Sequence, residues 1–507
     1  MEPVTDREKW RFRLIAEESL CVIIPTYNNA STVEDVVLRT YRYVRNIIVV
    51  NDGSTDDTAD ILSRLQRQTG ITVVSFPSNE GKGNALVEGF RVAKTMGFRF
   101  AVTIDSDGQH YPEDIPLLIA AEEKNIDAII IGSRNFEGKD ISEGSLFANR
   151  FSNFWLCVQT GRRLPDTQTG FRLYPLHKLY GLNFITSRYE SELELLVFAF
   201  WHGVKAVPVA VNVYYPPREE RVSHFRPGKD FARISILNTI LCFGAILYGY
   251  PLMALKWLRA FLRSLYALLF FVVCACGVTI YTLVDFNISK RNLAEKKRRL
   301  HRLLRRYADY VSNRIPGVKF TYKNTAGETF ERPSIIICNH QSHLDLMFTM
   351  QMTERMVIMT NEWVWNNPLY GRLIRYADFC PVTDGVEKTI DHVRELVAKG
   401  YSLLVFPEGT RSEDCSILHF HKGAFYLAEE LNLDIIPVYL YGSGLVLPKK
   451  AKMLREGEVC IEVGERVTPD NEAYGSGFRK RARRFERIYR ERLEQMQAEH
   501  INRKEER

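Results

Sequence analysis

The middle of the chain contains two long runs without a charged residue, and these runs decide how the rest can fold. The first run is Ile234–Leu255 and the second is Ser264–Val284. Each is close to the roughly 20 residues that a helix needs to cross the hydrocarbon core of a bilayer. We therefore expect a membrane-embedded or interfacial helical segment over residues 231–288, which divides the remaining sequence into two parts.

Three basic residues between the runs bear on how that segment meets the membrane. If the two runs formed a hairpin that spans twice, Lys256, Arg259 and Arg263 would lie outside, against the tendency of positive charge to stay inside. A re-entrant or interfacial pair of helices avoids this conflict, and we favour it. A buried core helix is the alternative for the first run.

The positive charge of the chain is concentrated beside the apolar runs. The net charge is +7 over 507 residues, and residues 231–330 alone hold 16 Lys and Arg against 4 Asp and Glu, a net +12. Much of this charge lies in Ser289–Tyr307, a strongly basic predicted helix. The placement favours a membrane surface with anionic lipids over nucleic acid as the partner, with a solvated charged helix as the alternative.

Cysteine usage and the N-terminus indicate the side of the membrane. The nine cysteines form no CxxC pair, as expected for reduced thiols in the cytosol. The first 20 residues carry charges throughout and lack the apolar run of a signal peptide. We expect the protein at the cytoplasmic membrane with its catalytic domains on the cytoplasmic side, unless the internal segment exports the part of the chain after it.

Both flanking parts alternate short apolar strands with amphipathic stretches. This pattern predicts mostly parallel α/β sheets, whose polar motifs follow the carboxyl ends of strands, where such sheets bind ligands. The predicted strands are 21–25, 46–51, 71–76, 101–105 and 128–132 in the first part, and 334–338, 401–406 and 434–440 in the second. The predicted helices of the first part are 31–43, 55–68 and 82–95, and a charged helix begins at Phe478.

The first part carries polar motifs that point to a nucleotide substrate. Asp105 and Asp107 end an apolar strand in TIDSDGQH, where two carboxylates can share one divalent cation that neutralises a diphosphate leaving group. Asp52, in VNDGSTDDT, is placed to accept hydrogen bonds from a base or ribose, or else to cap a helix. Gly83, in NEGKGNAL, suits a close approach to phosphate.

Together these motifs resemble glycosyltransferase family 2, of the dolichyl-phosphate mannosyltransferase type, over about residues 19–230. The resemblance implies a Rossmann-like domain of the GT-A type with a nucleotide-sugar donor and Mg²⁺ or Mn²⁺ as cofactor. It implies Asp105, Asp107 and Gln109 as metal ligands and Asp52 beside the base. Asn29 departs from the family, which often has Glu there. The implied substrate-binding residues are Pro25, Tyr27, Asp52 and Gly83, with Arg134 and Arg172 as phosphate contacts.

The need for a general base depends on the acceptor, because a phosphate is already an anion whereas a hydroxyl must lose its proton. Asp166, in DTQTGFR, is our candidate for a base or for acceptor positioning. Glu190 and Glu192 are weaker candidates, and a buried structural Asp166 is the rival interpretation. HFRPGKDF, at residues 224–231, is either a contact for a lipid phosphate or an interfacial anchor.

The second part carries motifs that point to acyl transfer. His340 and Asp345 follow the strand PSIIIC in CNHQSHLD, and a turn there can bring the carboxylate to the imidazole, as in catalytic triads. His343 also lies near Asp345 in sequence and is a competing imidazole. In FPEGTRS, Glu408 can orient the substrate or Arg411, whose guanidinium offers a fork for a phosphate.

These motifs resemble the lysophospholipid (1-acylglycerol-3-phosphate) acyltransferase family over about residues 303–467. The resemblance implies His340 as general base, Asp345 as its partner, and an acyl-ACP or acyl-CoA donor. The family's second motif supplies an Arg that FCPVTDG, at residues 379–385, lacks. Either Arg372 or Arg375 substitutes for it, or the acceptor lacks a glycerol phosphate. The implied acceptor-binding residues are Glu408, Gly409, Thr410 and Arg411.

The sequence therefore predicts two unrelated α/β domains on either side of a membrane-associated helical segment. The predicted function is sugar transfer to a lipid or lipid-phosphate acceptor and acyl transfer to a lipid hydroxyl, as in glycolipid or aryl-polyene-type lipid synthesis. The alternatives are two independent activities fused for location, one degenerate lipid-binding domain, and a membrane scaffold. The expected domains are 1–230 (glycosyltransferase), 231–288 (membrane segment), 289–330 (basic linker and start of the acyltransferase), 331–475 (acyltransferase) and 476–507 (charged helical tail).

Overall fold

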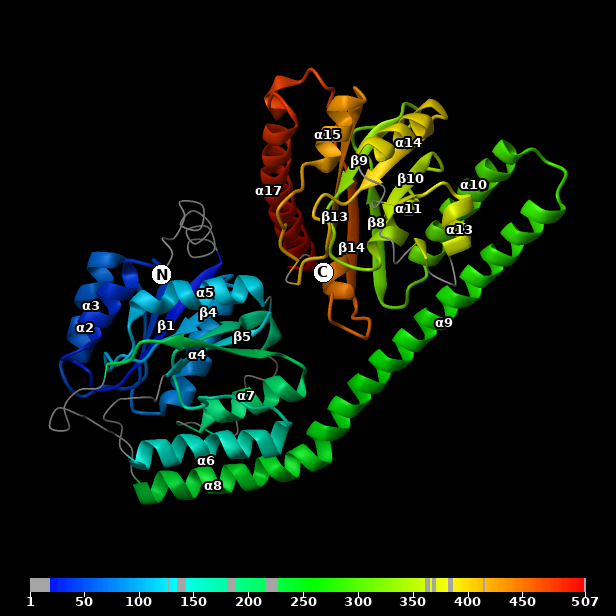
Figure 1. Ribbon diagram of the computed structural model, residues 1–507. Coiled ribbons are helices and arrows are strands. Elements are labelled where there is room, and N and C mark those ends of the chain that lie inside the picture. The colour runs from blue at the N-terminus through cyan, green and yellow to red at the C-terminus, as the bar shows by residue number, and fades with distance from the viewer. Residues whose placement is uncertain are drawn as a thin grey trace. The chain divides into compact units, whose positions relative to one another are not determined.

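The computed structural model describes residues 19–125, 127–134, 143–179, 186, 188, 190–214, 227–360, 365–366, 371–381, 386–413 and 415–505. The chain divides into two compact units, the first ending at Lys256 and the second beginning at Trp257. Each unit contains a seven-stranded sheet with helices against it (Figure 1). The predicted fold class of two α/β domains with a long apolar helical segment between them is confirmed.

The sheet of the first unit has the strand order β3-β2-β1-β4-β6-β5-β7. Strand β6 runs antiparallel to both β4 and β5, and the other pairings are parallel. The five strands predicted from apolar runs are confirmed, whereas β6 and β7 were not predicted. The strands are β1 (Leu20–Thr26), β2 (Ile47–Asn51), β3 (Thr72–Ser75), β4 (Phe100–Thr103), β5 (Ile129–Arg134), β6 (Arg172–Pro175) and β7 (Ala206–Val211).

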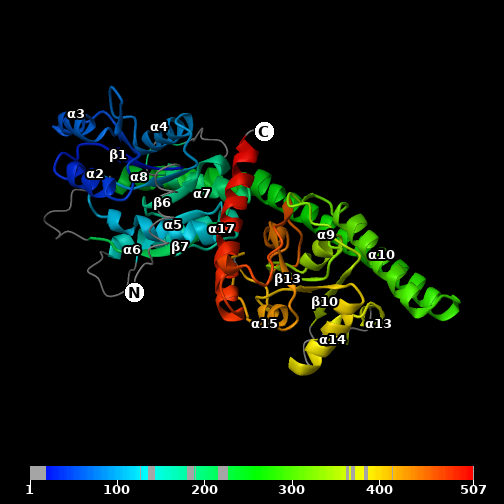
Figure 2. The same ribbon diagram turned by 90° about the horizontal axis from the view of Figure 1, so that it is seen from above.

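Helices cover both faces of this sheet (Figure 2). Apolar side chains of α2, α3 and α5 form one buried cluster with the sheet, and those of α4, α6 and α7 form another. Because β1, β2 and β4 are parallel, their carboxyl ends share one edge, and the polar motifs follow there. The helices are α2 (Val33–Tyr41), α3 (Thr58–Thr69), α4 (Lys82–Thr95), α5 (Ile115–Lys124), α6 (Glu143–Thr160) and α7 (Ser191–Trp201).

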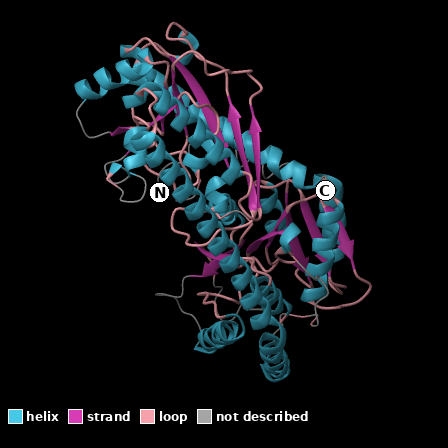
Figure 3. Ribbon diagram, turned by 90° about the vertical axis from the view of Figure 1, so that its right-hand side faces the viewer, coloured by secondary structure: helices cyan, strands magenta, loops and turns pink. Residues whose placement is uncertain are grey.

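The sheet of the second unit has the strand order β11-β10-β12-β9-β13-β14-β8. Figure 3 shows the strands in magenta among the cyan helices. Only the β13–β14 pairing is antiparallel. The central strand β9 is buried along its whole length, as expected for the apolar run SIIIC between two parallel neighbours. The strands are β8 (Val318–Lys323), β9 (Ser334–Cys338), β10 (Met356–Thr360), β11 (Cys380–Pro381), β12 (Ser402–Val405), β13 (Asp434–Tyr441) and β14 (Gly457–Val463).

The charged helix predicted from Phe478 contributes to the core of the second unit. Its buried Tyr489 donates a hydrogen bond to the carbonyl of Ile337 in β9 (2.6 Å) and accepts one from the amide of Val438 in β13 (2.9 Å). One side chain thus joins the two strands at the centre of the sheet. The helices are α10 (Leu293–Ser312), α11 (Asp345–Met350), α13 (Gly371–Tyr376), α14 (Val386–Ala398), α15 (Gly423–Glu430), α16 (Ser443–Val446) and α17 (Phe478–Glu505).

The two apolar runs do not form a pair of helices, which corrects our expectation. Helix α8 (Pro227–Gly244) continues through a π-helical turn (Ala245–Gly249) into α9 (Tyr250–Ile288) without a break. The wider turn precedes Pro251, whose ring and missing N–H would disturb a regular helix there. Residues 232–288 form a helix long and apolar enough to cross a membrane, and its most apolar window has a mean hydropathy of 2.4.

Two of the three basic residues between the runs have partners within their own unit. Lys256 donates to the carbonyl of His202 at 2.8 Å. Arg263 pairs with Glu456 and donates to the carbonyl of Leu454 at 2.9 Å. The helix runs through all three positions, as expected because Lys and Arg are good helix formers.

Candidate functional sites

The acidic motif of the first unit follows β4 at the shared carboxyl edge of the sheet. The hydroxyl of Ser106 donates to the carbonyl of Pro25 at the end of β1 (3.1 Å), which ties the two strand ends together. Asp107 has an exposed side chain, and its carboxylate accepts from the backbone amide of Gln109 at 3.0 Å. The surrounding protein still removes part of the hydration of this carboxylate, and that effect, followed by the nearby charge of Asp105, raises the pKa of Asp107 to about 6. The pair therefore holds negative charge that a cation would stabilise.

Lys82 partly compensates this charge. Its Nζ lies 2.7 Å from Oδ1 of Asp105 and 2.9 Å from Oε1 of Glu192, and all three side chains are largely buried. Burial opposes ionisation of Asp105, but the ammonium group outweighs it and lowers the pKa of that carboxyl. The second Asp105 oxygen lies against Gly170, where any Cβ would overlap it.

The two carboxylates of the motif suit a divalent cation bound together with a nucleotide. Within the described ranges, no group of three or more His, Cys, Asp or Glu side chains is arranged to hold a metal ion. Mg²⁺ commonly takes only one or two carboxylates from the protein and completes its coordination with phosphate oxygens and water. Asp105 and Asp107 match that donor set.

Asp52 follows β2 and holds the turn that leads into α4. It is 3% exposed, and its carboxylate accepts from the amides of Glu80 (2.7 Å) and Gly81 (2.9 Å). Gly53 has φ of 68°, and a Cβ there would overlap the backbone of Ser78. Neighbouring positions of the same edge are Pro25 in β1, the half-buried Tyr27 after it, and the buried Gly83 in the first turn of α4.

Asp166 and Arg134 form a buried bidentate pair. Arg134 Nε donates to one carboxylate oxygen at 2.7 Å and Nη2 to the other at 2.9 Å, and the amide of Gln168 adds a bond at 3.1 Å. Burial raises the pKa of Asp166, but these donors outweigh it and lower the pKa. Asp166 is fully buried, so this geometry favours the structural interpretation that the sequence left open.

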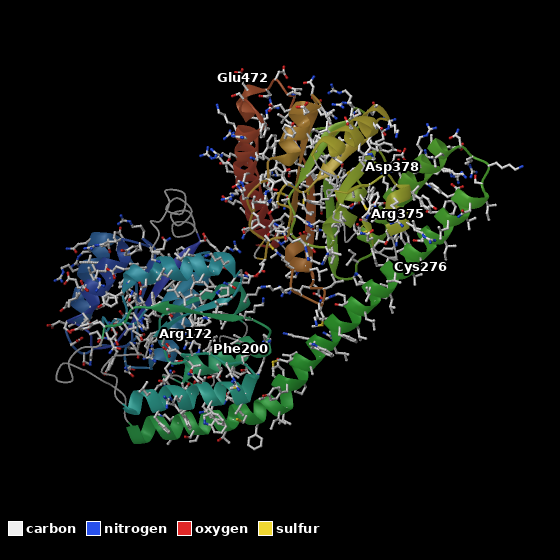
Figure 4. The ribbon with its side chains drawn as sticks, in the orientation of Figure 1. Arg172, Phe200, Cys276, Arg375, Asp378 and Glu472 are labelled. Atoms are coloured by element: carbon white, nitrogen blue, oxygen red, sulfur yellow. The ribbon has the colours of Figure 1, made fainter. Side chains whose placement is uncertain are left out.

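Arg172 lies inside the first unit and presents no surface to solvent (Figure 4). Its guanidinium donates to the hydroxyl of Tyr174 (3.2 Å) and to the carbonyls of Glu192 (3.0 Å) and Thr167 (2.7 Å). The motif HFRPGKDF starts outside the described residues, and no side chain of it is described. Arg172 thus joins the start of β6 to α7 and to the loop before β6.

The second site is built where β9 ends. Nδ1 of His340 lies 2.8 Å from Oδ2 of Asp345, which is fully buried. The same oxygen accepts from the amides of Gln341 (2.6 Å) and Ser342 (2.8 Å), so the carboxylate is fixed by the turn that the sequence suggested. An Nδ1–H that donates to Asp345 leaves Nε2 free to accept a proton.

The segment Phe406–Ser412 surrounds His340. The ring of Phe406 stacks on the imidazole with centroids 4.4 Å apart, and the amide of Ser412 donates to the His340 carbonyl at 3.2 Å. Glu408 is 3% exposed, and its Oε1 accepts from the His340 amide at 2.7 Å. The structure therefore brings the two motifs of this part together around one imidazole.

One guanidinium nitrogen of Arg411, Nη1, is buried and has no hydrogen-bond partner among the described residues. Burial, followed by the charges of Arg411 and His340, lowers the pKa of His343, so that imidazole lies close to both. Lys449 donates to the carbonyl of Arg411 at 2.8 Å and lies 3.4 Å from the hydroxyl of Thr410. Gly409 has φ of 66°, in the left-handed region that favours glycine.

Comparison with known families identifies the two domains that contain these sites. A family model described as "Glycosyl transferase family 2" matches residues 21–177, and a second, described as "Acyltransferase", matches residues 317–441. The chain joins a family 2 glycosyltransferase domain to an acyltransferase domain. The first match contains both carboxylates of the acidic motif, and the second contains His340 and Arg411.

Curated relatives match each domain separately. A 1-acyl-sn-glycerol-3-phosphate acyltransferase of Chlamydomonas reinhardtii is 33% identical over 152 residues, which are 28% of this chain and 45% of that protein. A UDP-N-acetylglucosamine–dolichyl-phosphate N-acetylglucosaminyltransferase of Methanococcus voltae is 28% identical over 222 residues, which are 40% of this chain and 88% of that protein. The chain thus spans less than half the length of the acyltransferase relative.

Solved structures also match each domain. The 1-acyl-sn-glycerophosphate acyltransferase PlsC of Thermotoga maritima is 19% identical, with a TM-score of 0.40, and the match covers 48% of this chain and 98% of that one. A glucosyl-3-phosphoglycerate synthase of Mycobacterium tuberculosis, solved with Mn²⁺, UDP and phosphoglyceric acid, is 21% identical, with a TM-score of 0.34 and coverage of 48% and 84%.

Several residues of the glycosyltransferase and acyltransferase sites escaped the sequence reasoning. Lys82 lies within NEGKGNAL, where only the glycine drew attention, and its contact with Glu192 joins positions 110 residues apart. The side-chain amide of Asn339 donates to the carbonyl of Leu440 in β13 at 2.8 Å and accepts from the Leu440 amide at 2.9 Å, which fixes the residue before His340.

Arg372 and Arg375, which the sequence offered as substitutes for the missing Arg, are exposed on α13. Arg375 donates to the carbonyl of Trp365 at 3.0 Å.

Proposed function

We propose that this protein is a bifunctional membrane-associated enzyme. It transfers a sugar from a nucleotide-sugar to a lipid or lipid-phosphate acceptor, and it transfers a fatty acyl group from acyl-ACP or acyl-CoA to a hydroxyl of a lipid. The observation that carries this proposal is the presence in one chain of two separate polar sites, the acidic motif beside Lys82 and the His340–Asp345 pair, with an apolar helix between their domains.

In the glycosyltransferase domain, Asp105, Asp107 and Gln109 would hold Mg²⁺ or Mn²⁺. The ion would neutralise the diphosphate of the leaving nucleotide. Lys82 keeps Asp105 ionised, Asp52 holds the turn before α4, and Arg134 is fixed by Asp166 at the end of β5. A phosphate acceptor fits this arrangement, because it attacks as an anion and needs no general base. The dolichyl phosphate named for the Methanococcus relative supports that acceptor class.

In the acyltransferase domain, His340 takes the proton of the acceptor hydroxyl as its oxygen attacks the thioester carbonyl. Asp345 holds the imidazole in the required tautomer and stabilises the imidazolium that forms. The proton then passes to the departing thiolate. The guanidinium of the half-buried Arg411 is our candidate contact for an anionic acceptor group. We place the acceptor beside Gly409, Thr410 and Arg411, and the lysophospholipid named for the Chlamydomonas relative supports a lipid acceptor.

Both reactions would take place at a membrane. The apolar face of α9 is exposed, and the most apolar window of residues 232–288 is only 6% buried. The glycosyltransferase domain adds exposed aromatic residues on α6, namely Phe147 and Phe154, and Phe243 on α8. The basic helix α10 suits anionic headgroups, and we propose the cytoplasmic face as the side on which both domains work.

Mass spectrometry of total lipids from cells that carry His340→Ala or Asp107→Ala tests this function. If both sites serve one product, the His340 variant accumulates a sugar-bearing lipid lighter by one acyl group, and the Asp107 variant lacks the sugar. Changes in two unrelated lipids would instead show two independent activities that share only a location. Unaltered lipids in both variants would contradict the enzymatic proposal.

A further inference from the structure

Both oxygens of the Glu408 carboxylate accept hydrogen bonds from backbone amides. Oε1 accepts from the amide of His340 at 2.7 Å, and Oε2 accepts from the amide of Leu418 at 2.8 Å. The residue is 3% exposed. A side chain with both oxygens used in this way has little capacity left for a substrate, although the family resemblance implies a role in acceptor binding.

The other contacts of His340 come from the same short segment. Phe406 stacks on its ring, Ser412 donates to its carbonyl, and Glu408 accepts from its amide. Asp345 fixes only the ring nitrogen Nδ1 and the turn after it. The backbone of His340 is therefore held by Glu408 and Ser412 from one side and by the strand β9 from the other.

The geometry points to Glu408 as a positioning residue that fixes the catalytic imidazole, and not as a ligand of the acceptor. This inference rests on the acyl transfer proposed above. By joining the amides of His340 and Leu418, the carboxylate sets the distance between the turn after β9 and the loop after FPEGTRS. An error of about 1 Å in the placement of a catalytic group can lower a rate on the order of 100-fold.

The bond pattern favours an ionised carboxylate, because each oxygen faces an N–H donor. A Gln at this position would direct its own NH₂ against one of those amides, and the hydroxyl oxygen of a protonated Glu408 would be a weaker acceptor. Burial raises the pKa of Glu408 to about 7 although both amides lower it. The charged or titratable groups that face it are Asp345, Arg490, Cys338, Tyr489 and His340.

Steady-state kinetics of Glu408→Gln tests the inference in the full-length protein. Release of thiol from palmitoyl-CoA would be followed with 1-oleoyl-glycerol-3-phosphate as acceptor. We expect kcat to fall by about 10- to 100-fold while the KM for the acceptor changes by less than about 3-fold. Arg411→Ala is the comparator and should raise that KM. Any other pattern for Glu408→Gln, including a raised acceptor KM or an unaltered kcat, overturns the inference.

The pH dependence of kcat gives a second readout. Because loss of the Glu408 charge lowers kcat only about 10- to 100-fold, its protonation near pH 7 should make the acid limb of log kcat steeper in the wild-type protein than in Glu408→Gln. Acid limbs of equal steepness in the two proteins overturn the inference. If the wild-type protein releases no thiol from acyl-CoA or acyl-ACP with any lipid acceptor, the proposed function itself fails, which is distinct from either result above.

Discussion

Lys82 shows how much a single buried cation organises the glycosyltransferase site. It lies between two carboxylates from distant parts of the chain, one after β4 and one in α7. Without the ammonium group the two carboxylates would repel each other in a poorly hydrated place, and its charge lowers the pKa of Asp105. The position of Asp105 therefore depends on Lys82, a residue that lies outside the acidic motif.

Replacing Lys82 by Met should destabilise the first unit by about 3 kcal/mol, because it leaves two buried carboxylates without their cation. The unfolding free energy measured by urea titration checks this result. Lys94→Met is the matched control on the same helix, since Lys94 is exposed and should change the free energy by less than about 0.5 kcal/mol.

The effect of Lys82 should also depend on pH. Its ammonium lowers the folded-state pKa of Asp105, whose ordinary value is 3.8, so the stabilisation is present above that pH and is lost as pH falls below it. The difference between the wild type and Lys82→Met should narrow below about pH 4. A difference that stays constant from pH 7 to pH 3 would show that Asp105 is not the partner that matters.

At the scale of elements, the sequence predicted what depends on local pattern. Apolar, β-branched runs located β1, β2 and β9 to within a residue or two, because each is buried between neighbouring strands. Strand β6 escaped, because its four residues follow a polar motif and include Arg172. The continuity of α8 and α9 escaped for a different reason. The expectation of two helices rested on the basic residues between the apolar runs, and Lys and Arg are themselves good helix formers that do not end a helix.

The same distinction holds for the sites. The His340–Asp345 contact spans five positions, and a turn of that length is visible in sequence. The bond from Glu408 to the His340 amide spans 68 positions and depends on which strands are neighbours. Pattern alone therefore identified Glu408 as part of the site without indicating what it contacts.

The π-helical turn before α9 depends on a glycine. A Cβ at Gly249 would overlap the indole of Trp201, which donates to the carbonyl of Gln159 at 2.8 Å. Gly249→Ala should lower the unfolding free energy of the first unit by about 1–3 kcal/mol through overpacking. Gly277→Ala, in the middle of α9 with no atom within 4 Å of a new Cβ, should be neutral or stabilise by up to about 1 kcal/mol. Equal effects of the two substitutions in denaturant titrations would contradict the packing explanation.

For the whole molecule, the proposal fixes what should be accessible from each side of a membrane. Cys276 is exposed on α9, and Glu472 lies in the acyltransferase domain (Figure 4). In intact inside-out vesicles, a water-soluble maleimide should label a Glu472→Cys variant that has no other cysteine. A second variant, which retains only Cys276, should be labelled only after detergent is added. Equal labelling of Cys276 in intact vesicles would place α9 outside the bilayer. Labelling of Glu472→Cys only in right-side-out vesicles would reverse the proposed side.

The bridge that Tyr489 makes between β9 and β13 has a consequence for synthesis on the ribosome. All strands of the glycosyltransferase sheet emerge before residue 212, and that domain can complete its core while the rest is still being translated. In the acyltransferase domain, the Tyr489 hydroxyl that bridges the two central strands is synthesised about 150 residues after β9. Under the proposed function, a nascent chain would meet the membrane with α9 and a finished first domain. Because α17 contributes to the core of the second unit, that core is complete only in the last stage of translation.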